Sequence, residues 1–207
     1  MQIFQSRDIT LDSIKITAPG DSPNTDGIHI ADSTNIQVTN SVIGTGDDCI
    51  SIGPGCTNLT IFNVICGPGH GISIGSLGKN ANEKDVTGLT VRQCTLTGTS
   101  NGLRIKTWPS SPSSLKATGF VFEDIIMNNV YNPIIIDQNY CPYVNCPETV
   151  YLLTTATTTT TKYIIRVLKV FEFVHPPSLS SFRILLWLRS RTSNSETSRG
   201  PLPRQKL

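Results

Sequence analysis

The amino-acid sequence predicts an all-β fold, a parallel β-helix in which the chain winds into stacked coils. Three short strands of alternating apolar residues recur at a constant interval, at 27–30, 49–52 and 71–74. A repeat of about 20–25 residues whose unit is a strand and a turn is typical of a β-solenoid. Because no helical hydrophobic period competes with it, we interpret positions 9 to 140 as about five coils.

A second series of strands supports the same winding. Strands are expected to stack at almost the same interval over 13–16, 35–38 and 58–61. The interval is longer in the later coils, as between 88–91 and 119–122. The additional residues fall in stretches rich in Gly and Asn or in Ser and Pro, which is the composition of turns.

A column of polar residues follows from this period. Successive coils stack at the inter-strand spacing of about 4.8 Å, so Asp26, Asp48 and His70, which are equally spaced along the chain, should lie one above another. Asp47 adds a further carboxylate at the middle level. Like charges this close repel each other and raise a pKa, so the column indicates catalysis or a bound cation. Without the column, the repeat would fit an inert structural solenoid such as an adhesin equally well.

The acids and the nearby cations suit one chemistry. Hydrolysis of a glycosidic bond needs one protonated carboxyl group to donate to the leaving oxygen and one carboxylate to activate water. Arg104 and Lys106 share the outer face of their strand because side chains alternate along it, and the period places them over Ser73 and Gly75. Two cations beside three acids suit an anionic substrate whose carboxylate must be held. Tyr140 stands one coil further on, in a position to stack against this level.

The charge distribution divides the chain. Residues 1–161 carry eight Lys and Arg against 13 Asp and Glu, whereas residues 162–207 carry nine against two. The net charge of +2 therefore combines two unlike segments and does not indicate nucleic-acid binding. We expect a folded domain over 1–147 and a disordered tail over 148–207 outside the fold, with a basic surface-binding arm as the alternative for the tail. Its apolar stretches are too short to span a bilayer.

Six cysteines and one sequon favour an oxidising compartment. Cys141 and Cys146 bracket a tight loop in which a local disulfide is expected, although spacing does not give pairing. Free buried thiols are the alternative for Cys56 and Cys94. Asn58 begins an Asn-Leu-Thr sequon, a glycosylation site if the chain is secreted. The amino end lacks the apolar core of a signal peptide.

Four short motifs occur in the order Asn24-Thr-Asp26, Gly46-Asp-Asp48, Gly69-His-Gly71 and Arg104-Ile-Lys106. In this order they resemble the four signature motifs of polygalacturonases, the pectin-cleaving glycoside hydrolases, and the strings around them are similar to the plant branch. The resemblance covers about residues 1–147. It implies a right-handed parallel β-helix and hydrolysis of α-1,4-linked galacturonan with inversion at the anomeric carbon.

The resemblance also implies catalytic roles. Asp47 would be the general acid, and Asp26 and Asp48 would position and activate the water. His70 would support the site, where it tunes the acid. No cofactor and no metal ion are implied.

The same resemblance implies a polygalacturonate or pectin oligosaccharide as partner, in an extracellular or cell-wall location. Arg104 and Lys106 would hold the substrate carboxylate, Tyr140 would line that subsite, and Asn24 belongs to the substrate-binding motif. A further implication is a disulfide between Cys49 and Cys66. We expect a monomer with no nucleic-acid or membrane partner. Family members usually carry a secretion signal, several coils before the first motif and further coils after the last, so the resemblance implies a truncated chain.

The sequence leaves two rival functions open. A pectate lyase would use a Ca²⁺ ion held by carboxylates such as Asp26, Asp47 and Asp48, and would cleave by elimination. A truncated chain could also be inactive, or bind pectin without cleaving it. The Gly-Asp-Asp and Gly-His-Gly motifs favour hydrolysis.

Overall fold

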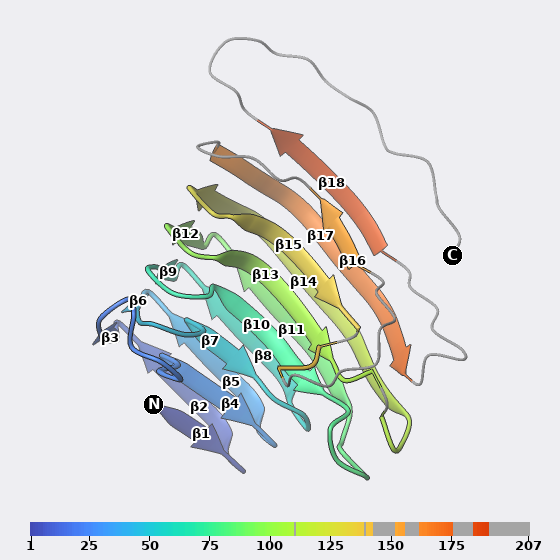
Figure 1. The fold of residues 1–207 in the computed structure, drawn as a ribbon. Coiled ribbons are helices and arrows are strands. Elements are labelled where there is room, and N and C mark those ends of the chain that lie inside the picture. The colour runs from blue at the N-terminus through green and yellow to red at the C-terminus, as the bar shows by residue number, and fades with distance from the viewer. Residues whose placement is uncertain (110, 139, 143–151, 156–161, 176–183, 191–207) are drawn as a thin grey trace.

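The structure is a computed structural model in which parallel strands form a stack of coils (Figure 1). It describes residues 1–109, 111–138, 140–142, 152–155, 162–175 and 184–190. These residues form strands and turns, and they include no helix with the length and hydrophobicity that a membrane crossing needs. The predicted all-β solenoid is therefore confirmed.

Each of the first four coils supplies three strands. The first strands are β1 (Gln2–Phe4), β4 (Ile28–Ala31), β7 (Ile50–Ile52) and β10 (Ile72–Leu77). The second strands are β2 (Arg7–Asp12), β5 (Thr34–Thr39), β8 (Thr57–Phe62) and β11 (Val86–Arg92). The third strands are β3 (Lys15–Thr17), β6 (Val42–Gly44), β9 (Ile65–Cys66) and β12 (Thr95–Thr97). The next coil has β13 (Asn101–Thr107) and the long β14 (Leu115–Asn128), and β15 (Asn132–Asp137) follows.

Corresponding strands of successive coils pair in parallel and form the sheets of the solenoid. One sheet has the order β1-β4-β7-β10-β13-β15-β16, in which β16 is Leu152–Thr155, and the other joins the second and third series through β14. Ile50 pairs with both Ile28 and Ile72, which confirms the shorter predicted interval. Leu89 pairs with Phe120, which confirms the longer interval of the later coils.

The predicted interval for the first coil is wrong. Residues 13–16 do not stack under 35–38, because Ile9 pairs with Ile36 and Leu11 with Val38. The turn between β3 and β4 is longer than the turn between β6 and β7, so the first coil takes more residues. The spacing along the chain between segments 13–16 and 35–38 therefore does not reflect strand pairing.

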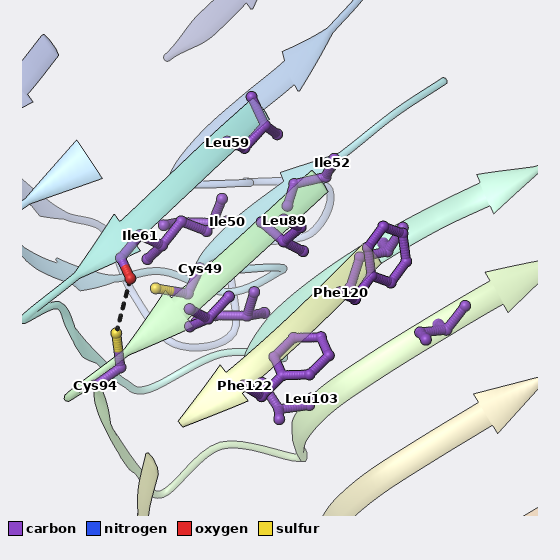
Figure 2. Close-up of a cluster of buried hydrophobic side chains, with 14 of the residues drawn as sticks. Cys49, Ile50, Ile52, Leu59, Ile61, Leu89, Cys94, Leu103, Phe120 and Phe122 are labelled. Atoms are coloured by element: carbon purple, nitrogen blue, oxygen red, sulfur yellow. Dashed lines mark hydrogen bonds between the residues drawn. The ribbon is translucent and has the colours of Figure 1, made fainter. Parts of the chain in front are cut away.

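Alternation along each strand directs the apolar side chains into the interior of the coil. Ile50 and Ile52 of β7 face Leu59 and Leu89 of the opposite sheet, and Phe120 enters the same interior (Figure 2). All five are at most 2% exposed. Full burial of such a side chain contributes about 1.5–3 kcal/mol, so the stack of isoleucines, leucines and phenylalanines stabilises the platform that carries the polar column.

An aspartate and two asparagines form a hydrogen-bonded ladder across β2, β5 and β8 of three successive coils. Asp8, Asn35 and Asn58 have positive φ angles of 58°, 56° and 57°, a backbone conformation that Asn and Asp tolerate well. The amide of Asn58 donates to Asn35 at 2.7 Å, and the amide of Asn35 donates to Asp8 at 2.7 Å. The asparagine of the sequon is exposed, and its glycosylation stays a prediction.

The described cysteines include both disulfide-bonded residues and free thiols. Cys49 and Cys66 form a disulfide, as the resemblance implies. Cys56 and Cys94 are free and buried, and burial raises the pKa of each thiol to about 11. Cys141 is disulfide-bonded, but the predicted pairing with Cys146 lies outside the described residues.

Three described segments follow residue 147, and all are strands: β16 (Leu152–Thr155), β17 (Lys162–His175) and β18 (Ile184–Ser190). They run antiparallel to their neighbours, since β16 pairs with β15, β17 with β14 and β18 with β17 (Figure 1). The disorder expected for the tail is therefore not what these segments show. An apolar stretch in β17 pairs with the edge of β14, and its Ile165 is buried in the core. A domain boundary at residue 147 stays a prediction.

Candidate active site

The predicted polar column lies at the turns that precede β4, β7 and β10. Gly27 N donates to Asp48 O at 2.9 Å, and His70 N donates to Asp47 O at 2.8 Å. These backbone hydrogen bonds join neighbouring coils at the level of the acids. Asp26, Asp48 and His70 therefore stand on three successive coils, at the ends of strands that pair in the predicted register.

Asp48 is the most buried acid of the column. Its Oδ1 accepts a hydrogen bond from Ser73 Oγ at 2.6 Å, and its Oδ2 lies 3.0 Å from the Nζ of Lys106. The side chains of Lys106 and Asp48 are 9% and 4% exposed. Burial raises the pKa of the Asp48 carboxyl group, and the ammonium of Lys106 and the hydroxyl of Ser73 offset part of that rise.

One carboxylate oxygen of Asp47 is hydrogen-bonded within the protein. Its Oδ1 accepts hydrogen bonds from the Asp48 N–H at 2.8 Å and from the Nδ1 of His70 at 2.9 Å. The Asp47 side chain is 24% exposed and that of His70 is 43% exposed. Within the described part of the chain, no hydrogen bond reaches Asp47 Oδ2, so this oxygen can face a ligand.

Two glycines allow His70 to approach Asp47. Gly69 has a φ of 128°, and a side chain there would run into the carbonyl oxygen of Asp47. Gly71 has a φ of 84°, and its Cβ would run into the carbonyl oxygen of Asn101 on the next coil. Only glycine fits such close approaches at positive φ, which explains why glycines flank the histidine in this motif.

Asp26 is the acceptor in a short chain of hydrogen bonds. Ser51 Oγ donates to Asp26 Oδ2 at 2.5 Å and lies 2.7 Å from the Nδ1 of His29. A serine hydroxyl has one proton to donate. Because that proton goes to Asp26, the imidazole of His29 must donate from Nδ1 to the serine oxygen, and this orients the hydroxyl toward the acid.

The residues that orient the acids were not predicted from the sequence. His29, Ser51 and Ser73 form a second polar column, because Ser51 pairs with both His29 and Ser73, and Ser73 pairs with Arg104. Each serine bonds an aspartate of the preceding coil. The period of the repeat and the strand alternation contained this signal, since these positions share the outer face.

The predicted cationic group is assembled around one aromatic ring. The Cζ of Arg104 lies 5.3 Å and the Nζ of Lys106 lies 5.2 Å from the ring centroid of Tyr140. Tyr140 N donates to Thr107 O at 3.0 Å, which anchors the tyrosine on the neighbouring coil. Asn24 is exposed with a φ of 49°, and in the described residues it takes no part in the hydrogen bonds that join the acids.

The same acids could hold a cation. Ligand atoms of Asp47, Asp48 and His70 lie within 4.8 Å of one another. The donor set includes an imidazole, whereas Ca²⁺ prefers oxygen ligands only. In addition, Lys106 already supplies a positive charge to Asp48. This arrangement favours a protein cation over a calcium ion, and the expectation of no metal stays a prediction.

A parallel β-solenoid with clustered carboxylates on neighbouring coils is typical of a glycoside hydrolase. The chain belongs to such a family: residues 1–162 match glycosyl hydrolases family 28. It is 58% identical over 146 residues to an exopolygalacturonase from Platanus acerifolia, a match that covers 70% of this chain and 38% of that protein. It is 56% identical over 148 residues to a polygalacturonase from Medicago sativa, a match that covers 72% of this chain and 35% of that protein.

A solved structure resembles this chain in both sequence and fold. The polygalacturonase from Erwinia carotovora ssp. carotovora is 34% identical in sequence and superposes with a TM-score of 0.56. The match covers 67% of this chain and 36% of the bacterial protein. The chain thus spans well under half the length of the relatives that it matches, and it contains the coils that carry the acids.

Proposed function

We propose that this chain carries the catalytic centre of an enzyme that hydrolyses the α-1,4 links of galacturonan with inversion at the anomeric carbon. The observation that carries the proposal is the placement of Asp26 and Asp48 on neighbouring coils, with Asp47 beside them. The names of the relatives, polygalacturonase and exopolygalacturonase, support the substrate class.

In this proposal Asp47 is the general acid. Its Oδ1 is occupied by the Asp48 N–H and by His70, so Oδ2 carries the proton that passes to the leaving glycosidic oxygen. His70 holds the carboxyl group in one orientation, and a positioned proton donor is worth about 10²–10⁴ in rate.

Asp26 and Asp48 are the proposed bases for water. Ser51 fixes Asp26 Oδ2, and in the described residues Oδ1 has no hydrogen-bond partner, so it can accept a hydrogen bond from the water. Burial raises the pKa of Asp48, which makes its ionised form a stronger base. An inverting mechanism needs such carboxylates on the face of the sugar opposite the acid.

The substrate carboxylate is assigned to the cationic group. Arg104 and Lys106 lie over the ring of Tyr140, and Arg104 Nε is buried without a hydrogen-bond partner among the described residues. A buried donor of this kind is costly unless a ligand pairs with it. Asn24, exposed two residues before Asp26, is proposed as an outer contact to the sugar.

An assay of the purified chain on polygalacturonate tests the proposal. Hydrolysis should release reducing ends without ultraviolet-absorbing products, should be insensitive to a chelator, and should give the inverted anomer in a proton NMR time course. Asp47→Asn should lower the rate by about 10²–10⁴. The control is Asp21→Asn, at an exposed position before the first motif, which should leave the rate unchanged. Unchanged hydrolysis in Asp47→Asn would overturn the assignment of the acid.

Binding without turnover is the alternative that the same assay separates from hydrolysis. It predicts that the chain retains oligogalacturonate but releases no reducing ends. Calcium-dependent elimination is a third candidate, which predicts ultraviolet-absorbing products that disappear with a chelator. We further propose an extracellular, monomeric protein of the cell wall that needs no cofactor and has no nucleic-acid or membrane partner.

A further inference from the structure

A row of cations and aromatic rings continues beyond the proposed carboxylate subsite. Trp108 follows β13, and its ring lies 6.1 Å from the ring of Tyr140 at an interplanar angle of 85°. The Nζ of Lys79, which follows β10, lies 5.4 Å from the centroid of Trp108. Lys79, Trp108 and Tyr140 therefore come from three successive coils and meet beyond the ends of their strands.

The backbone holds this row in place. Trp108 N donates to Leu77 O at 2.9 Å, so the tryptophan is tied to the coil that carries Lys79. The carboxylate of Glu83 accepts hydrogen bonds from Gly78 N at 2.7 Å and Asn80 N at 2.8 Å. Glu83 thus bonds the backbone on both sides of Lys79 and directs that turn.

The cations of the row differ in whether a carboxylate pairs with them. Lys106 is paired with Asp48, whereas no carboxylate of the described residues forms an ion pair with Arg104 or Lys79. Lys79 is exposed and Trp108 is half-buried. Within the described residues, the row therefore contains two cations without a carboxylate partner, Arg104 at the ring of Tyr140 and Lys79 at the ring of Trp108.

We infer that Lys79 and Trp108 form a second subsite for an anionic sugar, next to the subsite of Arg104 and Tyr140. The ammonium of Lys79 binds the carboxylate of the adjoining uronate, and the indole of Trp108 packs against the apolar face of that sugar. This inference rests on the proposed substrate class and extends it by assigning Lys79 and Trp108 to a further uronate beyond the one held by Arg104. A cation–π contact that only stabilises the turn is the structural alternative.

Fluorescence of Trp108 tests the inference directly. The chain has two tryptophans, so Trp187→Phe leaves Trp108 as the only indole, and Asp47→Asn in the same chain slows turnover by about 10²–10⁴. Titration with trigalacturonate should change the emission with saturation, and a neutral galactose trisaccharide should not. Lys79→Gln should weaken trigalacturonate binding about tenfold, the effect of about 1.4 kcal/mol, and should leave monogalacturonate binding, measured by NMR titration, unchanged.

Lys84→Gln is the matched control, because Lys84 lies in the same turn, is exposed, and pairs with Asp32 outside the row. Lys79→Arg, which keeps the charge, should restore affinity. The inference is overturned if Lys79→Gln binds trigalacturonate as tightly as its parent, or if Lys84→Gln weakens it equally. If neither oligomer nor monomer binds to the parent, the proposed substrate class fails and the second subsite fails with it. If both bind and only the Lys79 effect is absent, the second subsite alone is wrong.

Discussion

Lys106 and Asp48 form a buried ion pair between β13 and the turn before β7, with Nζ and Oδ2 3.0 Å apart. The two residues are 58 positions apart in the chain. Ser73 bonds the other oxygen of the carboxylate, so the acid at the centre of the column is held from two coils. This pair links the cationic group to the acids, and it is the point at which stability and the proposed chemistry depend on the same atoms.

Removal of one partner of this pair should be costly. Lys106→Met leaves the Asp48 carboxylate buried without its counter-ion, which should lower the free energy of unfolding by about 3–5 kcal/mol. The double variant with Asp48→Asn should recover much of that loss, because no buried charge is left. Urea unfolding of the parent, both single variants and the double variant measures the coupling, and additive losses would contradict the pair.

The stability of the chain should depend on pH through Asp48. The unfolded chain releases this proton near the ordinary pKa of 3.8, whereas the folded chain keeps it to higher pH because burial raises the pKa. The protonated Asp48 side chain therefore makes its full contribution to stability below pH 3.8. This contribution is lost as the pH rises through the pKa that Asp48 has in the folded chain. Relative to Asp48→Asn, the parent should lose stability as pH rises from 3.8 through the raised folded pKa, as urea unfolding at several pH values would show. A difference that is constant with pH would contradict this expectation.

Ser51 should matter to both stability and turnover. Ser51→Ala leaves Asp26 Oδ2 and His29 Nδ1 without their partner, which should cost about 1–3 kcal/mol of unfolding free energy. If Asp26 positions the water, kcat should fall about tenfold or more while KM changes little. Thr10→Ala, an exposed position on β2, is the control and should change neither quantity.

Gly71 and Gly98 offer a matched pair for the close approach at His70. Both have positive φ angles, 84° and 64°, but a Cβ on Gly71 meets the backbone of Asn101, whereas a Cβ on Gly98 meets nothing within 4 Å. Gly98→Ala should therefore cost only the conformational penalty of about 1–2 kcal/mol. Gly71→Ala should cost at least about 2 kcal/mol more, measured by thermal or urea unfolding. Equal losses would show that the coils can move apart at this point.

The sequence predicted most of the winding because period and alternation are local properties. The pairing of Ile28, Ile50 and Ile72, and of Leu89 with Phe120, follows from intervals that can be read along the chain. The pairing of the first coil could not be read in this way, because the length of one turn shifted the register. The strands after residue 147 were missed as well, since they pair antiparallel and do not continue the repeat.

The sequence by itself determined that the chain coils, which acids share a column, and which family it belongs to. These depend on the period of apolar residues and on short motifs, both of which are written along the chain. Only the tertiary structure decided which partner each acid has: Ser51 and His29 at Asp26, Lys106 and Ser73 at Asp48, and His70 at Asp47. The physical reason is that hydrogen bonds and ion pairs form over about 3 Å, so the exact length of every intervening turn decides which side chains meet.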